Sequence, residues 1–540
     1  MTTTVIALSG PVGSGKSSLA VRLQRNLKAR HVKTNVLIEA LCPDIKRARR
    51  ELQEAGDRLD LETDGSWVGR QLYLMLEREP QDSVKYVVLD AVRIAQQLVH
   101  LRRFFQSVVH IHLTADDVAL RERYAQRPPK IEEVPTYDAV RENLTEKNIE
   151  TLASLADAVI DTVQCTEEDI FSRVVARLGK RPSIAPACVD VLVGGQYGSE
   201  GKGNIAAYLA REYDVLVRVG GPNAGHKVFR RDQRPFTFQH IPSGALSNPA
   251  AKLVIGAGAV LRPKKLLEEI AALSLDITRL LIDGQAMVIE ESDVEWEQNN
   301  LKGEISSTAQ GVGMATARKV LRRPQGTDVR LARDLPELKH LVGDTVTYLS
   351  DAICEGSRIF LEGTQGTSLG IHHGFYPHVT SRVTSASGCI AEAGLAPRHV
   401  RRVIMVCRTY PIRVGNSSTG KTSGPMSREI SLEVVSKRSG IDLAILREIE
   451  KGSVSGTPRR IGEFDWDQFR KSALLNGPTD IALTFADYLG IANKKAFRYE
   501  QLTPETLRFI EELEKVGGVP VSLISTDFSE RNIIDRRAWE

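Results

Sequence analysis

The sequence lacks the features that mark several special classes of protein. Its six cysteines stand singly, with no CxxC spacing, which argues against a zinc knuckle and a disulfide framework and favours a reducing compartment. No basic leader and no apolar segment long enough to cross a bilayer is present, so we expect a cytoplasmic protein without a membrane partner. Neither charge dominates: 72 basic and 68 acidic residues leave a net charge of +4, too small to predict a nucleic-acid partner.

What is present indicates a folded protein of more than one domain, because 540 residues exceed one ordinary core and 42% of them are hydrophobic. The first domain opens with an apolar run at 5–8, a glycine-rich turn, and leucines at the helical spacing of positions 19, 23 and 27. Further apolar runs at 35–38, 86–89 and 108–113 are expected to be strands, separated by charged helical stretches such as 116–127. This alternation predicts a parallel α/β sheet.

A second α/β domain is expected after a short linker. The last helix of the first domain should end near Leu178, and residues 179–187 (GKRPSIAPA) concentrate proline, glycine and serine. A new strand then starts at Val189 and again leads through a glycine-rich loop into a helix. The predicted fold is therefore α/β with two domains, 1–178 and 188–540.

The first glycine-rich turn, Gly10-Pro-Val-Gly-Ser-Gly-Lys-Ser17, fits GxxxxGK[ST] and lies between the strand and helix that this motif requires. In such a loop the backbone around Gly10, Gly13 and Gly15 holds phosphate oxygens, and Lys16 neutralises their charge. The Ser17 hydroxyl is the expected ligand of Mg²⁺. The first domain is thus predicted to bind a nucleoside triphosphate.

Other segments of this domain resemble the deoxynucleoside monophosphate kinases. Residues 49–56 (RRELQEAG) resemble their acceptor-binding helix, 90–93 (DAVR) follow a strand as in that family, and 156–162 (ADAVIDT) resemble their closing strand. Arg121, Arg123 and Arg127 stand where these kinases carry a lid, although a charged helical face explains Arg127 equally well. The resemblance implies a P-loop nucleotide kinase-like domain.

The second glycine-rich loop, Gly194-Gly-Gln-Tyr-Gly-Ser-Glu-Gly-Lys-Gly203, resembles that of adenylosuccinate synthetases, and six or more further motifs agree with that family in order. These are GGPNAGH (220–226), IPSG (241–244), STAQGVG (307–313), LEGTQGT (361–367), YPHVTS (376–381), SGTPRRIG (455–462) and TFAD (484–487). The resemblance covers nearly everything from Val189 onward. It implies a cytoplasmic homodimeric ligase in which GTP or ATP phosphorylates the 6-oxygen of a purine nucleoside monophosphate and L-aspartate then displaces the phosphate.

The chemistry explains the residue types, because oxide is a poor leaving group and charge spreads over the phosphoryl oxygens during transfer. Lys202 and Mg²⁺ stabilise that charge, and His226 matches the family's general acid. Gln365 and Thr380 match residues that hold the purine nucleotide. The resemblance further assigns nucleotide binding to Gly198, Glu200, Gly201, Gly203, Asn223, Ala224 and Gly225, and Gly225 is also assigned to the metal. It assigns the phosphate of the substrate to Thr308 and to Arg322, which is donated across the dimer interface. The guanine edge of GTP is assigned to Asp487, and L-aspartate is assigned to Thr457 and Arg459.

Three positions depart from the family pattern. Ser199 replaces the aspartate of GDEGKG, which in the family takes the N1 proton of the base and binds magnesium. Phage 2-aminoadenylosuccinate synthetases, which act on dGMP, resemble this chain in having serine there. Thr457 replaces a second arginine of the aspartate loop, and Phe485 replaces a lysine beside the base of the triphosphate.

Several alternatives remain open from the sequence. The favoured hypothesis is a ligase fused to a nucleotide kinase. One alternative is a nucleotide-binding sensor whose ligase site has lost turnover with the aspartate, and another keeps the kinase as the main activity with the ligase fold as an allosteric platform. IMP or a guanine monophosphate, ribose or deoxyribose, and ATP or GTP are all compatible with the motifs.

Overall fold

The computed structural model of the chain describes residues 3–46, 48–78, 84–126, 137–141, 149–178, 187–229, 234–322, 329–452, 456–529 and 532–537. The chain divides into two compact units, Met1–Ile184 and Ala185–Glu540. Most of the predicted linker, 179–186, lies outside the described residues. In the described part, no helix has the length and apolar character needed to span a membrane.

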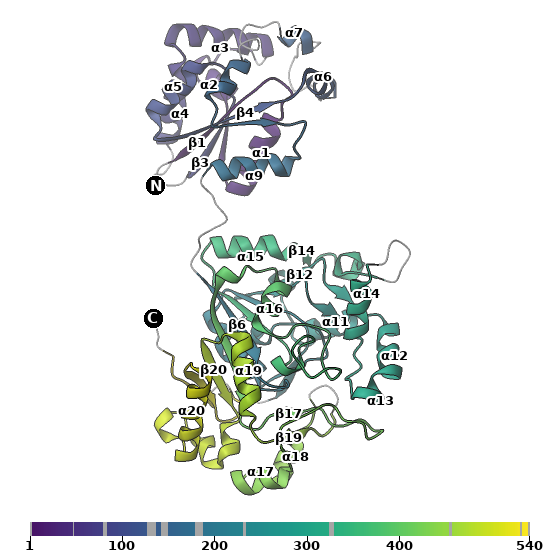
Figure 1. The fold of residues 1–540 in the computed structure, drawn as a ribbon. Helices are drawn as coiled ribbons and strands as arrows, with labels where there is room; N and C mark the ends of the chain where they lie inside the picture. The colour runs from purple at the N-terminus through teal and green to yellow at the C-terminus, as the bar shows by residue number, and fades with distance from the viewer. Residues whose placement is uncertain are drawn as a thin grey trace. The chain divides into compact units, whose positions relative to one another are not determined.

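The first unit is a five-stranded parallel sheet with helices on both faces (Figure 1). The strand order is β2-β3-β1-β4-β5, from β1 (Thr4–Ser9), β2 (Arg30–Lys33), β3 (Tyr86–Asp90), β4 (Ser107–Thr114) and β5 (Ala158–Asp161). The helices are α1 (Lys16–Leu27), α2 (Thr34–Leu41), α3 (Arg49–Thr63), α4 (Ser66–Glu77), α5 (Ala95–Phe104), α6 (Asp117–Ala125), α7 (Tyr137–Arg141) and α9 (Glu167–Arg177).

The apolar run of β1 is continuous because both faces of its sheet are buried. Val5 and Ala7 pack with helices α2 to α5, whereas Ile6 and Leu8 pack with α1 and α9. The predicted parallel α/β sheet is therefore confirmed.

One predicted strand is wrong. Residues 35–38 belong to helix α2, and the strand at this place is the more polar β2, which ends at Lys33. Within the run only Leu37 and Ile38 are buried, while Val36 is 48% exposed, as expected for one face of a helix. A run of four residues is too short to separate the two periodicities.

The second unit is built on a ten-stranded sheet of order β14-β12-β10-β7-β15-β6-β16-β20-β21-β22, parallel except for β22. Its strands are β6 (Val189–Gly194), β7 (Val215–Arg218), β10 (Lys252–Ile255), β12 (Leu280–Asp283), β14 (Val342–Gly343), β15 (Ile359–Glu362), β16 (Val400–Arg408), β20 (Asp480–Thr484), β21 (Val521–Ser525) and β22 (Ile533–Asp535). Smaller sheets pair β8 (His226–Phe229) with β9 (Pro235–Phe238), β11 (Val260–Leu261) with β13 (Met287–Val288), and β19 (Arg460–Gly462) with β17 (Ile412–Arg413) and β18 (Glu429–Ile430).

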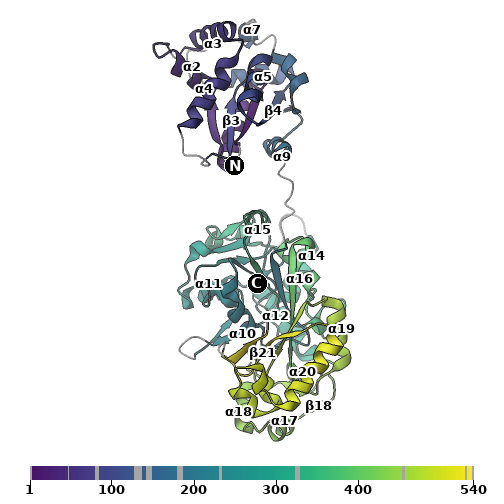
Figure 2. The same cartoon turned by 90° about the vertical axis from the view of Figure 1, so that its left-hand side faces the viewer.

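Helices again cover both faces of this large sheet (Figures 1 and 2). One core contains residues of α15, α16, α19 and α20, and the other contains residues of α10 and α11. The helices are α10 (Lys202–Leu209), α11 (Pro263–Ala272), α12 (Glu291–Asn300), α13 (Lys302–Ile305), α14 (Val312–Val320), α15 (Thr345–Cys354), α16 (Ala386–Ala393), α17 (Leu432–Ser439), α18 (Leu443–Ile449), α19 (Trp466–Asn476) and α20 (Pro504–Gly517).

Four of the five adjacent strands in the middle of this sheet end in a polar residue at their carboxyl ends. Strands β7, β15, β16 and β20 end in Arg218, Glu362, Arg408 and Thr484, and β6 leads into the glycine-rich loop. Ligand sites of open parallel sheets form at this edge, so the topology places these groups together.

Candidate active sites

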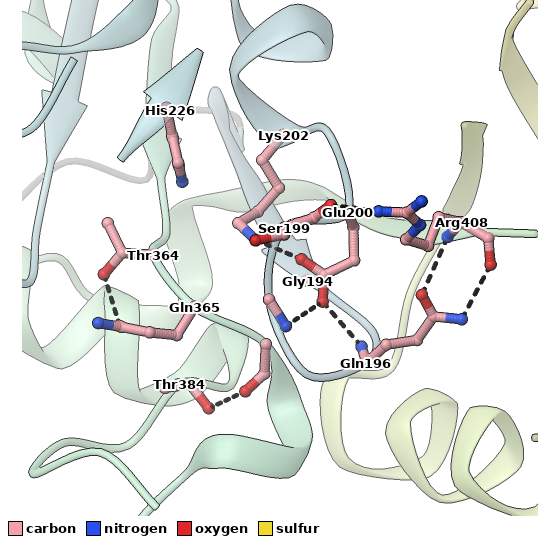
Figure 3. A network of polar contacts seen from close by, with 12 residues as sticks. Gly194, Gln196, Ser199, Glu200, Lys202, His226, Thr364, Gln365, Thr384 and Arg408 are labelled. Carbon is pink, nitrogen blue, oxygen red and sulfur yellow. Dashed lines mark hydrogen bonds and ion pairs between the residues drawn. The ribbon is translucent and has the colours of Figure 1, made fainter. Parts of the chain in front are cut away.

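The glycine-rich loop between β6 and α10 is shaped from inside by Glu200. This side chain is fully buried, and its Oε1 accepts hydrogen bonds from the backbone N–H of Gln196 (3.1 Å) and of Gly198 (2.8 Å). Lys202 Nζ donates to the other oxygen, Oε2, at 2.5 Å (Figure 3). The carboxylate of Glu200 therefore stabilises the conformation of the loop from within. Contact with a nucleotide is left to the other backbone groups of the loop.

Ser199 stands at the exposed tip of this loop. Its φ of +56° is left-handed, a region that non-glycine residues rarely adopt and in which aspartate is tolerated. Its carbonyl accepts a hydrogen bond from Arg408 Nη1 at 3.5 Å, and Arg408 is itself fixed by a reciprocal backbone pair with the Gln196 amide (Figure 3). The backbone at Ser199 is thus held in place independently of its side chain.

His226 is buried and fixed by a carboxylate from a distant strand. Its Nδ1 lies in close contact with Glu362 Oε1, which also accepts hydrogen bonds from Arg218 Nη1 at 2.9 Å and from the Ser243 hydroxyl. The Ser243 backbone N–H donates to Glu362 Oε2 at 2.7 Å. Four segments therefore converge to set the orientation of one imidazole.

The charges of this network define the tautomer of His226. Burial and the neighbouring Arg218 lower the pKa of His226 to about 4. Burial alone would raise the pKa of Glu362, but Arg218 and His226 outweigh it and lower this pKa to about 2. Because the ionised Glu362 can only accept, His226 carries its single proton on Nδ1 and presents the Nε2 lone pair to a ligand.

This network makes stability depend on pH. The unfolded chain protonates His226 near pH 6.5, whereas the folded chain resists protonation until about pH 4, so the unfolded state binds an extra proton between these values. Stability should fall as the pH falls through this window, by about 3 kcal/mol in all. Protonation of Glu362 lowers the stability further, but only between pH 4.5 and about 2.

The measurement is the unfolding of the ligase unit at pH 7 and pH 4.5 in the wild type and in His226→Gln. We expect the wild type to lose about 2 to 3 kcal/mol more than the variant, since glutamine does not titrate. Equal losses in the two proteins would exclude His226 as the titrating group.

Gln365 and Asn223, which are both expected to bind a nucleotide, contact each other. The Gln365 Nε2 group donates to Asn223 Oδ1 at 2.8 Å, and its Oε1 accepts from the Thr364 hydroxyl at 2.9 Å. Gln365 adopts a φ of +58°. Its amide and that of Asn223 present paired donors and acceptors, the groups that recognise a purine edge. The carbonyl of Ala224 is occupied by Arg218 Nη2 at 3.1 Å.

A cavity of about 210 Å³ lies beside the loop and gathers many of the expected residues. The predicted residues in its wall are Ser199, Gly201, Lys202, Gly203, Gly225, His226, Arg459 and Asp487. Burial and the neighbouring Asp527 raise the pKa of Asp487 to about 7.

Arg459 is positioned beside the cavity by a buried carboxylate, Glu450. Glu450 accepts hydrogen bonds from Arg408 Nη2 at 2.5 Å, from the Tyr488 hydroxyl at 2.8 Å and from Arg459 Nη1 at 3.4 Å. Burial lowers the pKa of the Arg459 guanidinium, and the negative charge of the nearby Glu450 partly offsets this effect. The fork of Arg459 is thereby held next to the cavity, while Thr457 is exposed.

Four residues expected at the substrate nucleotide, Gln365, Thr308, Thr380 and Arg322, do not line this cavity. Thr308 and Thr380 are half-buried loop residues: the Thr308 carbonyl accepts from Gln310 Nε2 at 3.1 Å, and the Thr380 backbone N–H donates to the Leu369 carbonyl at 2.8 Å. Arg322 is exposed in the turn after α14.

The donor groups for Mg²⁺ differ between the two units. In the first, the Ser17 hydroxyl donates to Asp90 Oδ2 at 3.0 Å, a hard oxygen pair that suits the ion. In the second, the expected group is the Gly225 carbonyl, and among the described residues no group of three or more acidic, histidine or cysteine side chains is placed to hold a metal ion. A metal ion there would take most of its ligands from phosphate and water.

The P-loop of the first unit opens onto a larger cavity of about 870 Å³. Gly13, Gly15, Lys16 and Ser17 line it, whereas Gly10 is a packing residue, since a Cβ there would lie 2.0 Å from the Leu113 carbonyl oxygen. Lys16 Nζ donates to the carbonyls of Gly10 and Pro11, at 2.7 Å each. The lysine therefore occupies the space inside the loop where a phosphate would lie.

The expected acceptor side of this cavity is formed by helix α3 and the end of β3. Gln53, Gly56, Arg93 and Arg123 line the cavity, but Arg121 pairs instead with Asp138 on the surface at 2.8 Å. Arg127 and the side chain of Arg49 lie outside the described residues.

Sequence reasoning did not single out Glu362, Arg218, Ser243, Arg408 and Glu450, which fix the side chains that face the ligand. Glu362 and Ser243 lie inside motifs that were noted, LEGTQGT and IPSG. Arg218 and Arg408 are charged residues at the ends of buried strands, a pattern that marks a site in a parallel sheet. No local signal distinguishes Glu450.

Comparison with known proteins identifies relatives of both units. The adenylosuccinate synthetase family model matches residues 191–335 and 327–495, and an AAA domain model matches residues 6–150. An adenylosuccinate synthetase of Methanocaldococcus jannaschii is 37% identical over 355 residues, which cover 64% of this chain and 96% of that protein. One from Pyrococcus horikoshii is 37% identical over 358 residues, which cover 64% and 98%.

Two solved structures share the fold of the second unit. Succinoaminodeoxyadenylate synthetase of cyanophage S-2L, bound to dGMP and to dATP as an energy donor, is 28% identical with a TM-score of 0.54, covering 65% of this chain and 96% of that one. The adenylosuccinate synthetase of Plasmodium falciparum is 20% identical with a TM-score of 0.57, over 65% and 100%, which shows the fold alone. With its glycine-rich loop, buried histidine and this family match, the chain belongs to the adenylosuccinate synthetase family and is a purine nucleotide ligase that carries an additional P-loop unit.

Proposed function

We propose that the ligase unit joins L-aspartate to C6 of a guanine nucleoside monophosphate, after a purine triphosphate has phosphorylated its 6-oxygen. The observation that carries this proposal is Ser199, an uncharged side chain at the rim of the cavity where the family has aspartate. A smaller group at this point leaves room for an exocyclic 2-amino group. The similar cyanophage enzyme was solved with dGMP.

The chain's own residues supply two parts of the chemistry. Lys202 can leave Glu200 and stabilise the transferring phosphoryl group, as the loop N–H groups also do. His226 must take a proton on Nε2 to act as an acid toward the 6-oxygen, and a bound phosphate dianion raises its pKa in that direction. Mg²⁺, on which the family depends, would neutralise phosphate charge beside Ser199 and Gly225.

Arg459 is the proposed partner of the aspartate carboxylate, because a guanidinium fork binds a carboxylate through two parallel hydrogen bonds. Thr457 offers only a hydroxyl in place of the family's second arginine. Arg322, exposed after α14, is proposed to bind the substrate phosphate of a second copy in a homodimer.

For the first unit we propose a nucleotide kinase that prepares the ligase's substrate or phosphorylates its product. Its P-loop, the Ser17–Asp90 pair and the arginines of its cavity support this function. A sensor without turnover is the alternative for the whole chain, but the intact His226–Glu362 pair and the position of Arg459 beside the cavity favour catalysis.

The proposed substrate is tested with IMP, dIMP, GMP and dGMP, each with L-aspartate and either ATP or GTP, by mass detection of the aspartyl adduct. A guanine monophosphate should be preferred over IMP by about 5-fold to 150-fold, because a site shaped for the 2-amino group is left unpaired by IMP. Adduct formation with none of the substrates would favour the sensor, and equal or better use of IMP would exclude the guanine substrate.

Ser199→Asp should erode that preference and raise the rate with IMP. The left-handed backbone at this position tolerates aspartate, and the new carboxylate would supply the base that the family uses, worth about 100-fold or more in rate. Ser199→Ala is the matched control, since it removes the hydroxyl without adding a base. An unchanged IMP to GMP ratio in Ser199→Asp would separate this residue from substrate choice.

A further inference from the structure

The 210 Å³ cavity beside the glycine-rich loop contains Asp487, the residue expected at the base of the triphosphate donor, and part of its wall is an aromatic box. Phe229, Phe485 and Phe528 all line it, with ring centroids 5.5 Å apart for Phe229 and Phe528 and 5.6 Å for Phe485 and Phe528. The Arg408 guanidinium lies 3.9 Å from the centroid of the Phe485 ring, which fixes that ring. Such a box binds the face of a planar base but does not distinguish adenine from guanine.

Two carboxyl groups line the same cavity, and their surroundings differ. Asp527 accepts a hydrogen bond from the Phe528 backbone N–H at 2.8 Å and lies 3.5 Å from Lys494 Nζ. Asp487 is only 5% exposed, and no other side chain in the described part of the chain donates a hydrogen bond to its carboxyl group. Asp487 accepts a hydrogen bond from its own backbone N–H, and the rest of its hydrogen-bonding capacity is available to a ligand in this cavity.

We propose that Asp487, which lines the cavity together with Asp527, reads the base of the triphosphate donor and accepts either guanine or adenine, according to whether Asp487 is ionised or protonated. This inference rests on the proposed ligase function. An ionised carboxylate only accepts hydrogen bonds, which suits the N1–H and 2-amino donors of guanine. A protonated carboxyl both donates and accepts, which suits N1 and the 6-amino group of adenine.

The charged groups around Asp487 make both forms available near neutral pH. Burial and the negative charge of Asp527 favour the protonated form, while Lys494 and Arg408 oppose it, and the resulting pKa is about 7. The balance between the two forms therefore shifts across the neutral pH range. Acid then favours the form that binds adenine, and alkali favours the form that binds guanine.

The test is the ratio of kcat/KM for ATP to kcat/KM for GTP in the full-length wild type between pH 6 and pH 8. Adduct formation is measured directly, because the P-loop unit also binds nucleotides. Taking the ratio cancels pH effects on the chemical step, which both donors share. In the ideal case the ratio changes about 10-fold per pH unit, and we expect at least a 10-fold rise from pH 8 to pH 6.

Three variants locate the effect. Asp487→Asn always donates and accepts, so it should prefer ATP with a ratio independent of pH. Asp527→Asn removes the charge that opposes ionisation of Asp487, so the ATP preference at pH 7 should fall and recover only at lower pH. Asp467→Asn, at an exposed aspartate of α19 that pairs with Lys471, should behave as the wild type.

The outcomes separate this inference from the proposed function. No adduct with either donor would refute the ligase function itself. Adduct formation with an ATP to GTP ratio that is constant across pH, or that is unchanged in Asp487→Asn, would overturn the reading of the base by Asp487 and leave the ligase intact.

Discussion

Replacing His226 by glutamine is expected to lower ligase turnover at least 100-fold, while nucleotide binding and the fold are retained. Glutamine cannot carry a proton to the 6-oxygen, and proton transfer by a positioned side chain is typically worth about 100-fold to 10,000-fold. The polar amide can keep one hydrogen bond to Glu362, so the packing of this buried site should survive. The measurements are kcat for adduct formation and the Kd of GTP.

The matched control is His340→Gln, at an exposed histidine outside the site. It should leave turnover unchanged. A near-normal kcat in His226→Gln would remove this histidine from the mechanism.

Glu362 acts through His226, so its loss should show in the pH profile. Without the negative charge of Glu362, the imidazolium is less stable, and the alkaline limb of the kcat profile should move to lower pH in Glu362→Gln. A purely structural role for Glu362 would lower the rate without moving that limb.

The parts of this protein that could be predicted from the sequence are those coded locally. Both glycine-rich loops were found because each motif requires a strand before it and a helix after it, and β1, α1, β6 and α10 take those places. The run at 35–38 failed because four apolar residues fit a helix and a strand equally well. A longer apolar run would have been needed to decide between a helix and a strand.

The supporting groups of the site could not be predicted because they are brought together by the order of the strands. Glu362 lies 136 residues from His226 in the chain, and they meet because β15 lies between β7 and β6. The order of the strands also contributes to the burial of Glu200, because the neighbouring Gly366 lies in the loop after β15. Sequence patterns name residues, but sheet topology decides which of them share a site.

Lys16→Ala should reduce phosphoryl transfer by the first unit at least 100-fold and leave the ligase rate unchanged. In the ligand-free loop Lys16 donates to the carbonyls of Gly10 and Pro11, so its ammonium already lies inside the phosphate cradle. A triphosphate would replace these carbonyls, and loss of one charged group that stabilises transferring oxygens costs about 100-fold to 1,000-fold.

The two activities should separate because each cavity is built within one compact unit, Met1–Ile184 or Ala185–Glu540. Transfer from ATP to a panel of purine and pyrimidine monophosphates is measured beside aspartyl adduct formation in the same preparation. Arg25→Ala, at an exposed position in the last turn of the same helix α1, is the matched control and should change neither activity. An equal loss of both activities in Lys16→Ala would show that the P-loop unit is required for ligase turnover, and it would then favour a regulatory role for nucleotide binding at this loop over a separate kinase reaction.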